Sequence, residues 1–393
     1  MTGDSDEPLG VRQLLVRVLV VPGLVVALAL GLVMAVINAL QHGAPAASAH
    51  RQVALSATGA ARRATPRTPP HRRGWTTTPP AAASSTRTPP HAAARVRAAD
   101  RRAHVPPVGA YVGSGDLDGA SQLSAALPGG LAGVLDYVDA GSWSTIADPS
   151  WLLDRWAPTR DPLILAVPML PASGASLATG ATGAYDGEFR QLARLLVADG
   201  EATATLVLGW SPLDPGLPWT VTQPAGATAY VAYFRHIVDT MRLVPGARFR
   251  FAFEPGPSGP EAIGPGAMGP GHLYPGNAYV DDIATQIFNR LPTPVGPASR
   301  WARVAAVPYG PDWVARFAAR LHRRLIVTGL ALVPAAAGGG GDDPAFVRSF
   351  FAWARQARVA SVTLWSQGTW AFTPANDPHA FALLRTIVSG ASG

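Results

Sequence analysis

Two acidic residues, Glu254 and Asp214, each follow a short apolar run of the kind that forms buried strands. Two carboxyl groups that face each other can act as acid and nucleophile, as in the cleavage of a glycosidic bond, if they lie about 5 to 5.5 Å apart. The alternative is structural: Glu254 would pair with an arginine, and Asp214, which begins an Asp-Pro-Gly sequence, would make a turn. The sequence leaves both interpretations open.

Four aromatic residues fall at or just after predicted strand ends, or in the loops that follow: Trp210, Trp219, Tyr309 and Trp365. Flat rings offer apolar faces to the C–H surface of a pyranose, while their N–H or O–H edges find hydrogen-bond partners. Each ring alone also suits packing inside the fold. Together they predict a cleft that can hold a glycan.

Metal, cofactor and nucleic-acid sites are not predicted. The chain has no cysteine, and its four histidines after residue 107 (His236, His272, His322 and His379) have no ligand spacing such as His-x-x-x-His. No Gly-x-Gly-x-x-Gly links a strand to a helix. Residues 108–393 carry 19 Arg against 21 acids, so this region has no basic surface suited to nucleic acid.

Eight short apolar runs alternate with helix-like stretches after residue 107, which predicts βα units around a parallel sheet. The runs are 108–112, 134–139, 163–169, 203–209, 249–253, 282–287, 325–330 and 359–365. The clearest amphipathic stretches are 187–198, 227–241, 311–323 and 344–358. This count predicts an α/β fold, a (β/α)8 TIM barrel over 108–393, whose functional residues follow the strand ends.

Three Asp-Pro pairs predict helix starts: Asp148-Pro149, Asp343-Pro344 and Asp377-Pro378. In each pair the aspartate can cap free N–H groups, and the proline suits the first helical position. Asp342 is not needed for this capping, so its role stays open.

The N-terminal part predicts a membrane segment. Residues 18–37 contain no charge, which matches the length of about 20 residues that crosses a bilayer. We predict a cytoplasmic segment 1–17, a transmembrane anchor 18–40 and an extracytoplasmic barrel, because Arg12 and Arg17 precede the apolar run. The alternative is a signal segment cleaved after Ala49, which would release a secreted protein.

Residues 41–107 predict a disordered linker rich in Pro, Ala and Arg. They hold 11 Arg against one acid and almost no aliphatic residues spaced to form a face. Proline and mutual repulsion of the arginines should extend this segment away from the membrane. The arginines either are merely solvated or hold anionic lipid or wall polymer.

Several motifs resemble actinobacterial members of glycoside hydrolase family 26, the β-mannanase-like barrels. These motifs are Gly-Ser-Trp-Ser at 141–144, Val-Pro-Met-Leu-Pro at 167–171, Leu-Gly-Trp at 208–210, Pro-Gly-Ala-x-Phe-Arg-Phe at 245–251, Tyr-Pro-Gly-x-Ala-Tyr-Val-Asp at 274–281 and Gly-Gly-Asp-Asp-Pro at 340–344. The resemblance runs from about Val108 to the C-terminus. It implies a β-mannan or β-glucan ligand and a supporting role for Trp365 beneath the sugar.

The catalytic residues of that family are replaced. Its strand-four motif, Gly-Trp-Glu-Phe-Asn, carries the acid/base Glu, and its strand seven ends in Pro-Glu-Trp, whose Glu is the nucleophile. This sequence has Ser211 at the first position and, by alignment, Leu330 at the second. Neither side chain can protonate a leaving group or attack a sugar carbon. The resemblance therefore implies a catalytically degenerate barrel.

Three functions remain open. The first is a degenerate glycosidase-like barrel that binds exported or cell-surface glycan through Trp210, Trp219, Tyr309 and Trp365. The second is an active endo-β-glycanase that uses the displaced acids Glu254 and Asp214. The third is a protein-binding partner in a polysaccharide synthesis or export complex.

Overall fold

The computed structural model describes residues 105–159, 161–256, 269–291 and 297–390. The predicted cytoplasmic segment, membrane segment and nearly all of the predicted linker lie outside these ranges. Within them, no helix combines the length and the apolarity needed to cross a bilayer. The predictions for the N-terminal region therefore stay predictions.

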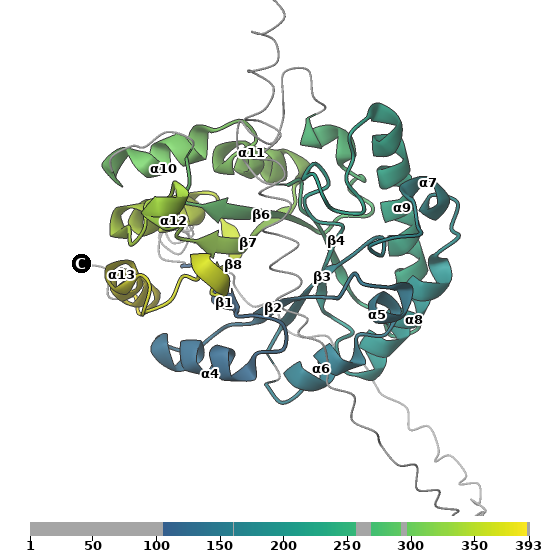
Figure 1. The fold of residues 1–393 in the computed structure, drawn as a ribbon, viewed down its shortest axis with the longest axis horizontal. Coiled ribbons are helices and arrows are strands. Elements are labelled where there is room, and N and C mark those ends of the chain that lie inside the picture. Colours follow the sequence, from purple (N-terminus) through teal and green to yellow (C-terminus); the bar gives the residue numbers. More distant parts are fainter. Residues whose placement is uncertain (1–104, 160, 257–268, 292–296, 391–393) are drawn as a thin grey trace, which may run out of the picture. The chain divides into compact units, whose positions relative to one another are not determined.

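Eight parallel strands close into a barrel in sequence order, which confirms the predicted (β/α)8 architecture (Figure 1). The strands are β1 (Val108–Tyr111), β2 (Val134–Tyr137), β3 (Leu163–Val167), β4 (Thr205–Leu208), β5 (Arg250–Phe253), β6 (Asp282–Phe288), β7 (Arg324–Ala331) and β8 (Val359–Trp365). Strand β1 closes the barrel against β8, where Tyr111 lies opposite Trp365. Each predicted strand exists.

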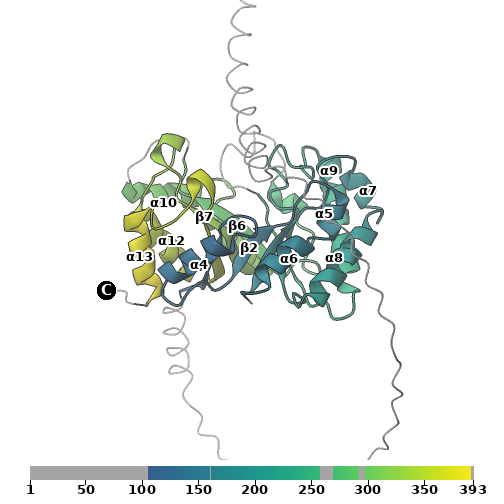
Figure 2. The ribbon, with the colours of Figure 1, turned by 60° about the horizontal axis from the view of Figure 1, so that its bottom comes forward.

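Helices surround the strands on all sides of the barrel (Figures 1 and 2). The α-helices are α4 (Leu117–Ala126), α5 (Trp143–Ala147), α6 (Ser150–Trp156), α7 (Leu177–Gly180), α8 (Asp186–Ala198), α9 (Pro224–Arg242), α10 (Pro297–Ala306), α11 (Pro311–Leu321), α12 (Pro344–Gln356) and α13 (Pro378–Val388). Short 3-10 helices are η1 (Pro270–Leu273), η2 (Ala335–Ala337) and η3 (Gly368–Trp370). The four amphipathic stretches noted in the sequence correspond to α8, α9, α11 and α12.

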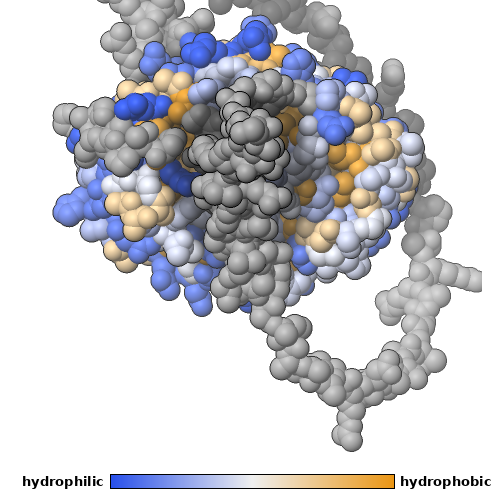
Figure 3. All heavy atoms as spheres, turned by 45° about the horizontal axis from the view of Figure 1, so that its top comes forward, coloured by the Kyte–Doolittle hydropathy of each residue, from blue (hydrophilic) through white to orange (hydrophobic). Residues whose placement is uncertain are grey.

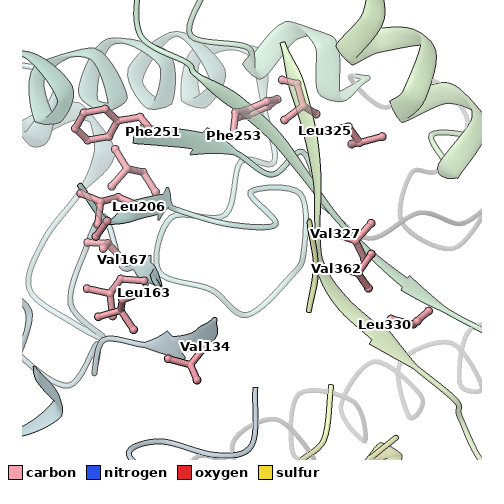
Figure 4. Close-up of a cluster of buried hydrophobic side chains, with 14 of the residues drawn as sticks. Val134, Leu163, Val167, Leu206, Phe251, Phe253, Leu325, Val327, Leu330 and Val362 are labelled. Carbon is pink, nitrogen blue, oxygen red and sulfur yellow. The ribbon is translucent and has the colours of Figure 1, made fainter. Parts of the chain in front are cut away.

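Two apolar clusters form the core, because side chains alternate along each strand between the barrel interior and the helices. The larger cluster fills the layer between strands and helices, and Figure 4 shows Leu206, Phe251 and Val327 within it. A small cluster of Val207, Ala252, Ala284 and Ile326 lies on the other side of the strands. Runs of Leu, Val and Ile are needed because both faces of each strand are covered.

An ion-pair cluster joins the N-terminal ends of three strands. Asp282, the first residue of β6, is fully buried. Arg250, the first residue of β5, donates to its carboxyl from Nε at 2.9 Å and from Nη2 at 2.7 Å. Arg324, the first residue of β7, donates from Nε at 2.8 Å. The two guanidinium groups compensate the buried charge.

Asp282→Asn is expected to lower the free energy of unfolding by about 2 to 3 kcal/mol, since both arginines lose their charged partner. Urea denaturation at neutral pH measures this loss. Arg324→Gln is the matched control: Arg324 is half-exposed, so its removal should cost about 1 kcal/mol or less. A larger loss for Arg324→Gln than for Asp282→Asn would contradict this account.

The predicted helix caps are correct for one Asp-Pro pair and wrong for another. Asp343 caps α12, because its Oδ1 accepts from Phe346 N at 2.9 Å. Asp377 stands before α13 but its side chain makes no cap hydrogen bond. Asp342 supplies that cap instead, since its Oδ1 accepts from Ala380 N at 2.7 Å. The carboxyl of Asp148 accepts from Ser150 N at 3.2 Å, within the first turn of α6.

Candidate functional site

A buried carboxyl group lies where β4 to β7 end. Glu254 follows β5 directly and is 1% exposed. Its Oε1 accepts from Gln286 Nε2 of β6 at 3.0 Å and from Ser211 Oγ, after β4, at 3.4 Å. Its Oε2 accepts from Thr328 Oγ1 of β7 at 2.5 Å. Four neighbouring strands thus contribute to one carboxyl site.

The partners of Glu254 are neutral. Its hydrogen bonds come from a serine, a glutamine and a threonine, so the interpretation that it pairs with an arginine is wrong. Burial raises the pKa of the Glu254 carboxyl to about 7, and the hydrogen bonds from Thr328, Ser211 and Gln286 lower it by less. Near neutral pH this carboxyl exists both with and without its proton.

Asp214 lies in a turn, as its Asp-Pro-Gly sequence predicted. Its backbone N–H donates to Ser211 O at 2.8 Å, and its carbonyl accepts from Thr220 Oγ1 at 2.6 Å. Burial raises the pKa of its carboxyl. Among the described residues, no hydrogen bond or ion pair joins the carboxyl groups of Asp214 and Glu254.

Ser211 has an unusual backbone. Its φ of 48° lies in the left-handed region, where a residue with a Cβ is strained by about 1 kcal/mol or more. Its N–H donates to the carbonyl of Glu254 at 3.2 Å, which ties the end of β4 to the end of β5. The strained turn thereby directs the Ser211 hydroxyl toward the Glu254 carboxyl.

Four rings form what we call the aromatic wall: Tyr111, Tyr137, Trp210 and Trp365. The centroid of Tyr137 lies 5.0 Å from those of Tyr111 and Trp210, and 6.1 Å from that of Trp365. Tyr111 and Trp365 are 4.7 Å apart. Tyr111 is buried, while the other three rings are partly exposed. The wall therefore presents ring surface to solvent from β2, β4 and β8.

Tyr137 connects the aromatic wall to the buried carboxyl. Burial and the charge of Glu254 raise the pKa of its hydroxyl well above the usual value, and a hydrogen bond with Gln286 lowers it. Gln286 therefore contacts both Tyr137 and Glu254. A ligand held against the wall would lie beside this pair.

Trp219 and Tyr309 lie differently from the other two predicted ligand-binding rings. Trp219 is buried, its centroid is 4.6 Å from that of Trp210, and its Nε1 donates to Trp210 O at 2.7 Å. It supports Trp210 from behind. Tyr309 precedes α11 and packs at 5.1 Å against Trp313. The structure thus brings Trp210, Trp219 and Trp365 together and places Tyr309 in another aromatic group.

The position aligned with the family nucleophile holds a packing residue. Leu330 is fully buried and belongs to the apolar layer with Val327 and Val362 (Figure 4). The register of β7 against β8 shifts between Val327 and Leu330, which interrupts the alternation of side chains. Thr328 is the β7 side chain that reaches the carboxyl site.

Sequence reasoning missed Tyr111, Tyr137, Gln286 and Thr328. Each lies inside a predicted strand, whereas functional residues were predicted only at or after the strand ends. A polar residue within an apolar strand run was the available signal for Gln286 and Thr328. Among the residues that the structure describes, no group of three or more His, Asp or Glu could hold a metal ion.

Apolar patches lie between polar ones on the face of the barrel shown in Figure 3.

No family profile and no curated protein matches the sequence. Solved structures of similar fold include several mannanases. The catalytic domain of the GH26 endo-β-1,4-mannanase of Bacillus sp. JAMB-750 is 14% identical, with a TM-score of 0.51, over 75% of this chain and 90% of that one. The modular family 26 endo-β-1,4-mannanase of Cellulomonas fimi is 14% identical, with a TM-score of 0.51, over 72% of this chain and 71% of that one.

The mannanase BCman of Bacillus subtilis is 14% identical, with a TM-score of 0.50, over 72% of this chain and 86% of that one. Identities this low concern the fold alone. The predicted resemblance is confirmed at that level: the described part of the chain is a (β/α)8 barrel with the fold of the glycoside hydrolase family 26 mannanases.

Proposed function

We propose that the barrel binds a β-linked polysaccharide of the mannan or glucan class and does not hydrolyse it. The observation that carries this proposal is the environment of Glu254, whose carboxyl is held by Ser211, Gln286 and Thr328. Retaining hydrolysis requires a second carboxyl group about 5 to 5.5 Å away. In this barrel the facing strand ends contribute a serine, an amide and a threonine.

The aromatic wall supports binding. Trp210 and Trp365 are partly exposed and held by neighbouring rings, so they can stack on a pyranose without ordering first. Gln286 and Tyr137 add polar groups that can meet sugar hydroxyls. The likeness in fold to mannanases supports the class of ligand.

Calorimetric titration with manno- and cello-oligosaccharides tests binding, and release of reducing ends from mannan and glucomannan tests hydrolysis. We expect heat of binding with at least one oligosaccharide and no release of reducing ends. Reducing ends released by the parent protein, and not by Glu254→Gln, would contradict the proposal. Absence of binding to every glycan would favour the protein-binding function.

A second candidate is an endo-β-glycanase that uses Glu254 and Asp214. It is favoured by the pKa of about 7 at Glu254, which suits a general acid. In this case Glu254→Gln and Asp214→Asn should each abolish cleavage while oligosaccharide binding persists. Unchanged cleavage in both variants would remove this candidate.

We also propose that residues 18–40 anchor the protein and that residues 41–107 hold the barrel outside the cytoplasm. The uncharged run and the arginines before it support this orientation. External protease should then degrade the barrel in intact cells. A mature chain that begins after Ala49 and appears in the medium would instead identify a secreted protein.

A further inference from the structure

A separate hollow lies on the flank of the barrel, between α5 and α8. These helices lie side by side in both ribbon views (Figures 1 and 2). The hollow is open to solvent and has a volume of about 520 Å³. Its lining includes Trp143, Ser144, Asp148, Glu188 and Gln191. None of these residues belongs to the aromatic wall or contacts Glu254.

Trp143 is held rigidly at the start of α5. A capping box fixes this turn: Ser142 Oγ accepts from Thr145 N at 3.2 Å, and Thr145 Oγ1 accepts from Ser142 N at 3.1 Å. The Trp143 ring packs 4.5 Å from Tyr185 and edge-on at 6.2 Å from Phe189. It stays partly exposed toward the hollow. A flat apolar surface is therefore available without further ordering.

Polar groups with free bonding capacity face the same hollow. Within the described residues, the side chains of Glu188 and Gln191 make no hydrogen bond. Ser144 Oγ shares one hydrogen bond with Ser142 Oγ at 2.7 Å and keeps further capacity. A carboxylate, an amide and a hydroxyl thus line the same hollow as one indole ring. Together they can accept from and donate to several adjacent hydroxyl groups.

The charge of the hollow selects against anions. Asp148 and Glu188 both line it, and among the residues that the structure describes no arginine or histidine does. Anionic sugars and phosphates would meet two carboxylates without a compensating cation. A neutral pyranose offers an apolar face to Trp143 and hydroxyl groups to Glu188 and Gln191.

We propose that this hollow is a second glycan site, which binds one neutral pyranose unit on the flank of the barrel. The class of ligand rests on the proposed function, but the residues are independent of the aromatic wall. Two separate contacts would let one long polysaccharide bind more tightly than either site alone allows. The acids and the ring would also suit an arginine side chain of a peptide, and such binding, unlike that of a neutral sugar, would be weakened by salt.

The test uses the full-length chain in detergent, titrated calorimetrically with mannopentaose and cellopentaose. We expect two sites per chain. The double variant Glu188→Ala/Gln191→Ala should lose the flank site, with an affinity at least about tenfold weaker, because two hydrogen-bonding side chains are removed. Trp365→Ala should weaken binding at the aromatic wall only. Trp151→Ala, an exposed tryptophan on α6 outside the lining, is the matched control and should bind as the parent does.

The outcomes separate this inference from the proposed function. The parent could have a single site that Glu188→Ala/Gln191→Ala removes and Trp365→Ala leaves intact. This result would support the flank site and contradict glycan binding at the aromatic wall. If the double variant binds both oligosaccharides as the parent does, or the parent binds neither, the inference is overturned. The same holds if only an arginine-rich peptide binds there and 0.5 M salt abolishes that binding.

Discussion

Replacing Glu254 with glutamine is expected to stabilise the barrel at pH 8 and to leave its stability almost unchanged at pH 4. In the folded protein the carboxyl keeps its proton up to about pH 7, while an ordinary glutamate has a pKa of 4.5. At a pH between these two pKa values, unfolding releases the proton of Glu254. The parent protein therefore loses stability as the pH rises from about 4.5 to 7. For a shift of this size the loss is about 3 kcal/mol. Glutamine has no such proton.

Urea denaturation of the parent and Glu254→Gln at both pH values measures this effect as a difference between the two proteins. The difference is needed because other buried acids titrate in the same range, among them Asp377, whose pKa is raised to about 7 by burial and by the charge of Asp342. Asp377→Asn is therefore the control: it should leave the pH dependence due to Glu254 intact. Parallel stability curves for the parent and Glu254→Gln would refute the assignment.

A buried acid whose pKa is raised by burial to about 7 is typical of functional sites rather than of packing. The strained φ of Ser211 is also typical of functional sites, since such strain persists only where the surrounding structure imposes it. Both features lie beside the aromatic wall. Glu254 is thus a buried acid whose hydrogen-bond partners from the neighbouring strands are all neutral.

The sequence predicted the barrel well because its signal is repeated. Each strand must be apolar on both faces, and eight such runs separated by helical stretches leave few other architectures. Strand ends differed from their predicted positions by at most two residues. That accuracy suffices to count strands, but it does not decide which side chains face the interior.

The site was predicted less completely, because strand ends known to within two residues do not fix which side chains face the barrel interior. Side chains alternate with a period of two, so a shift of one residue exchanges the interior and the helix side. The register shift in β7 places Thr328 at the carboxyl and Leu330 in the apolar layer, which no alignment of single residues could anticipate. Similarly, the cap of α13 comes from Asp342, far away in sequence. Such contacts depend on the assembled barrel.

Trp365→Ala is expected to weaken the binding of manno- or cello-oligosaccharide at least about tenfold. The Trp365 ring is partly exposed, is fixed by a hydrogen bond from its Nε1 to Gln367 O at 3.0 Å, and packs against Tyr111 and Tyr137. Its removal takes away stacking surface that is already ordered, and such rings contribute about 1 to 3 kcal/mol where they anchor a ligand. Calorimetric titration gives the change in Kd.

Tyr309→Ala is the matched control, and it also decides between two placements of the ligand. Tyr309 was predicted from sequence to bind glycan with Trp365, but its ring packs against Trp313, and among the described residues no ring contact joins it to the aromatic wall. If the ligand lies against the wall, Tyr309→Ala should bind it as the parent does. An equal loss in both variants would show that the ligand contacts Tyr309 as well as the aromatic wall. A loss in Tyr309→Ala alone would show that the aromatic wall is only part of the core.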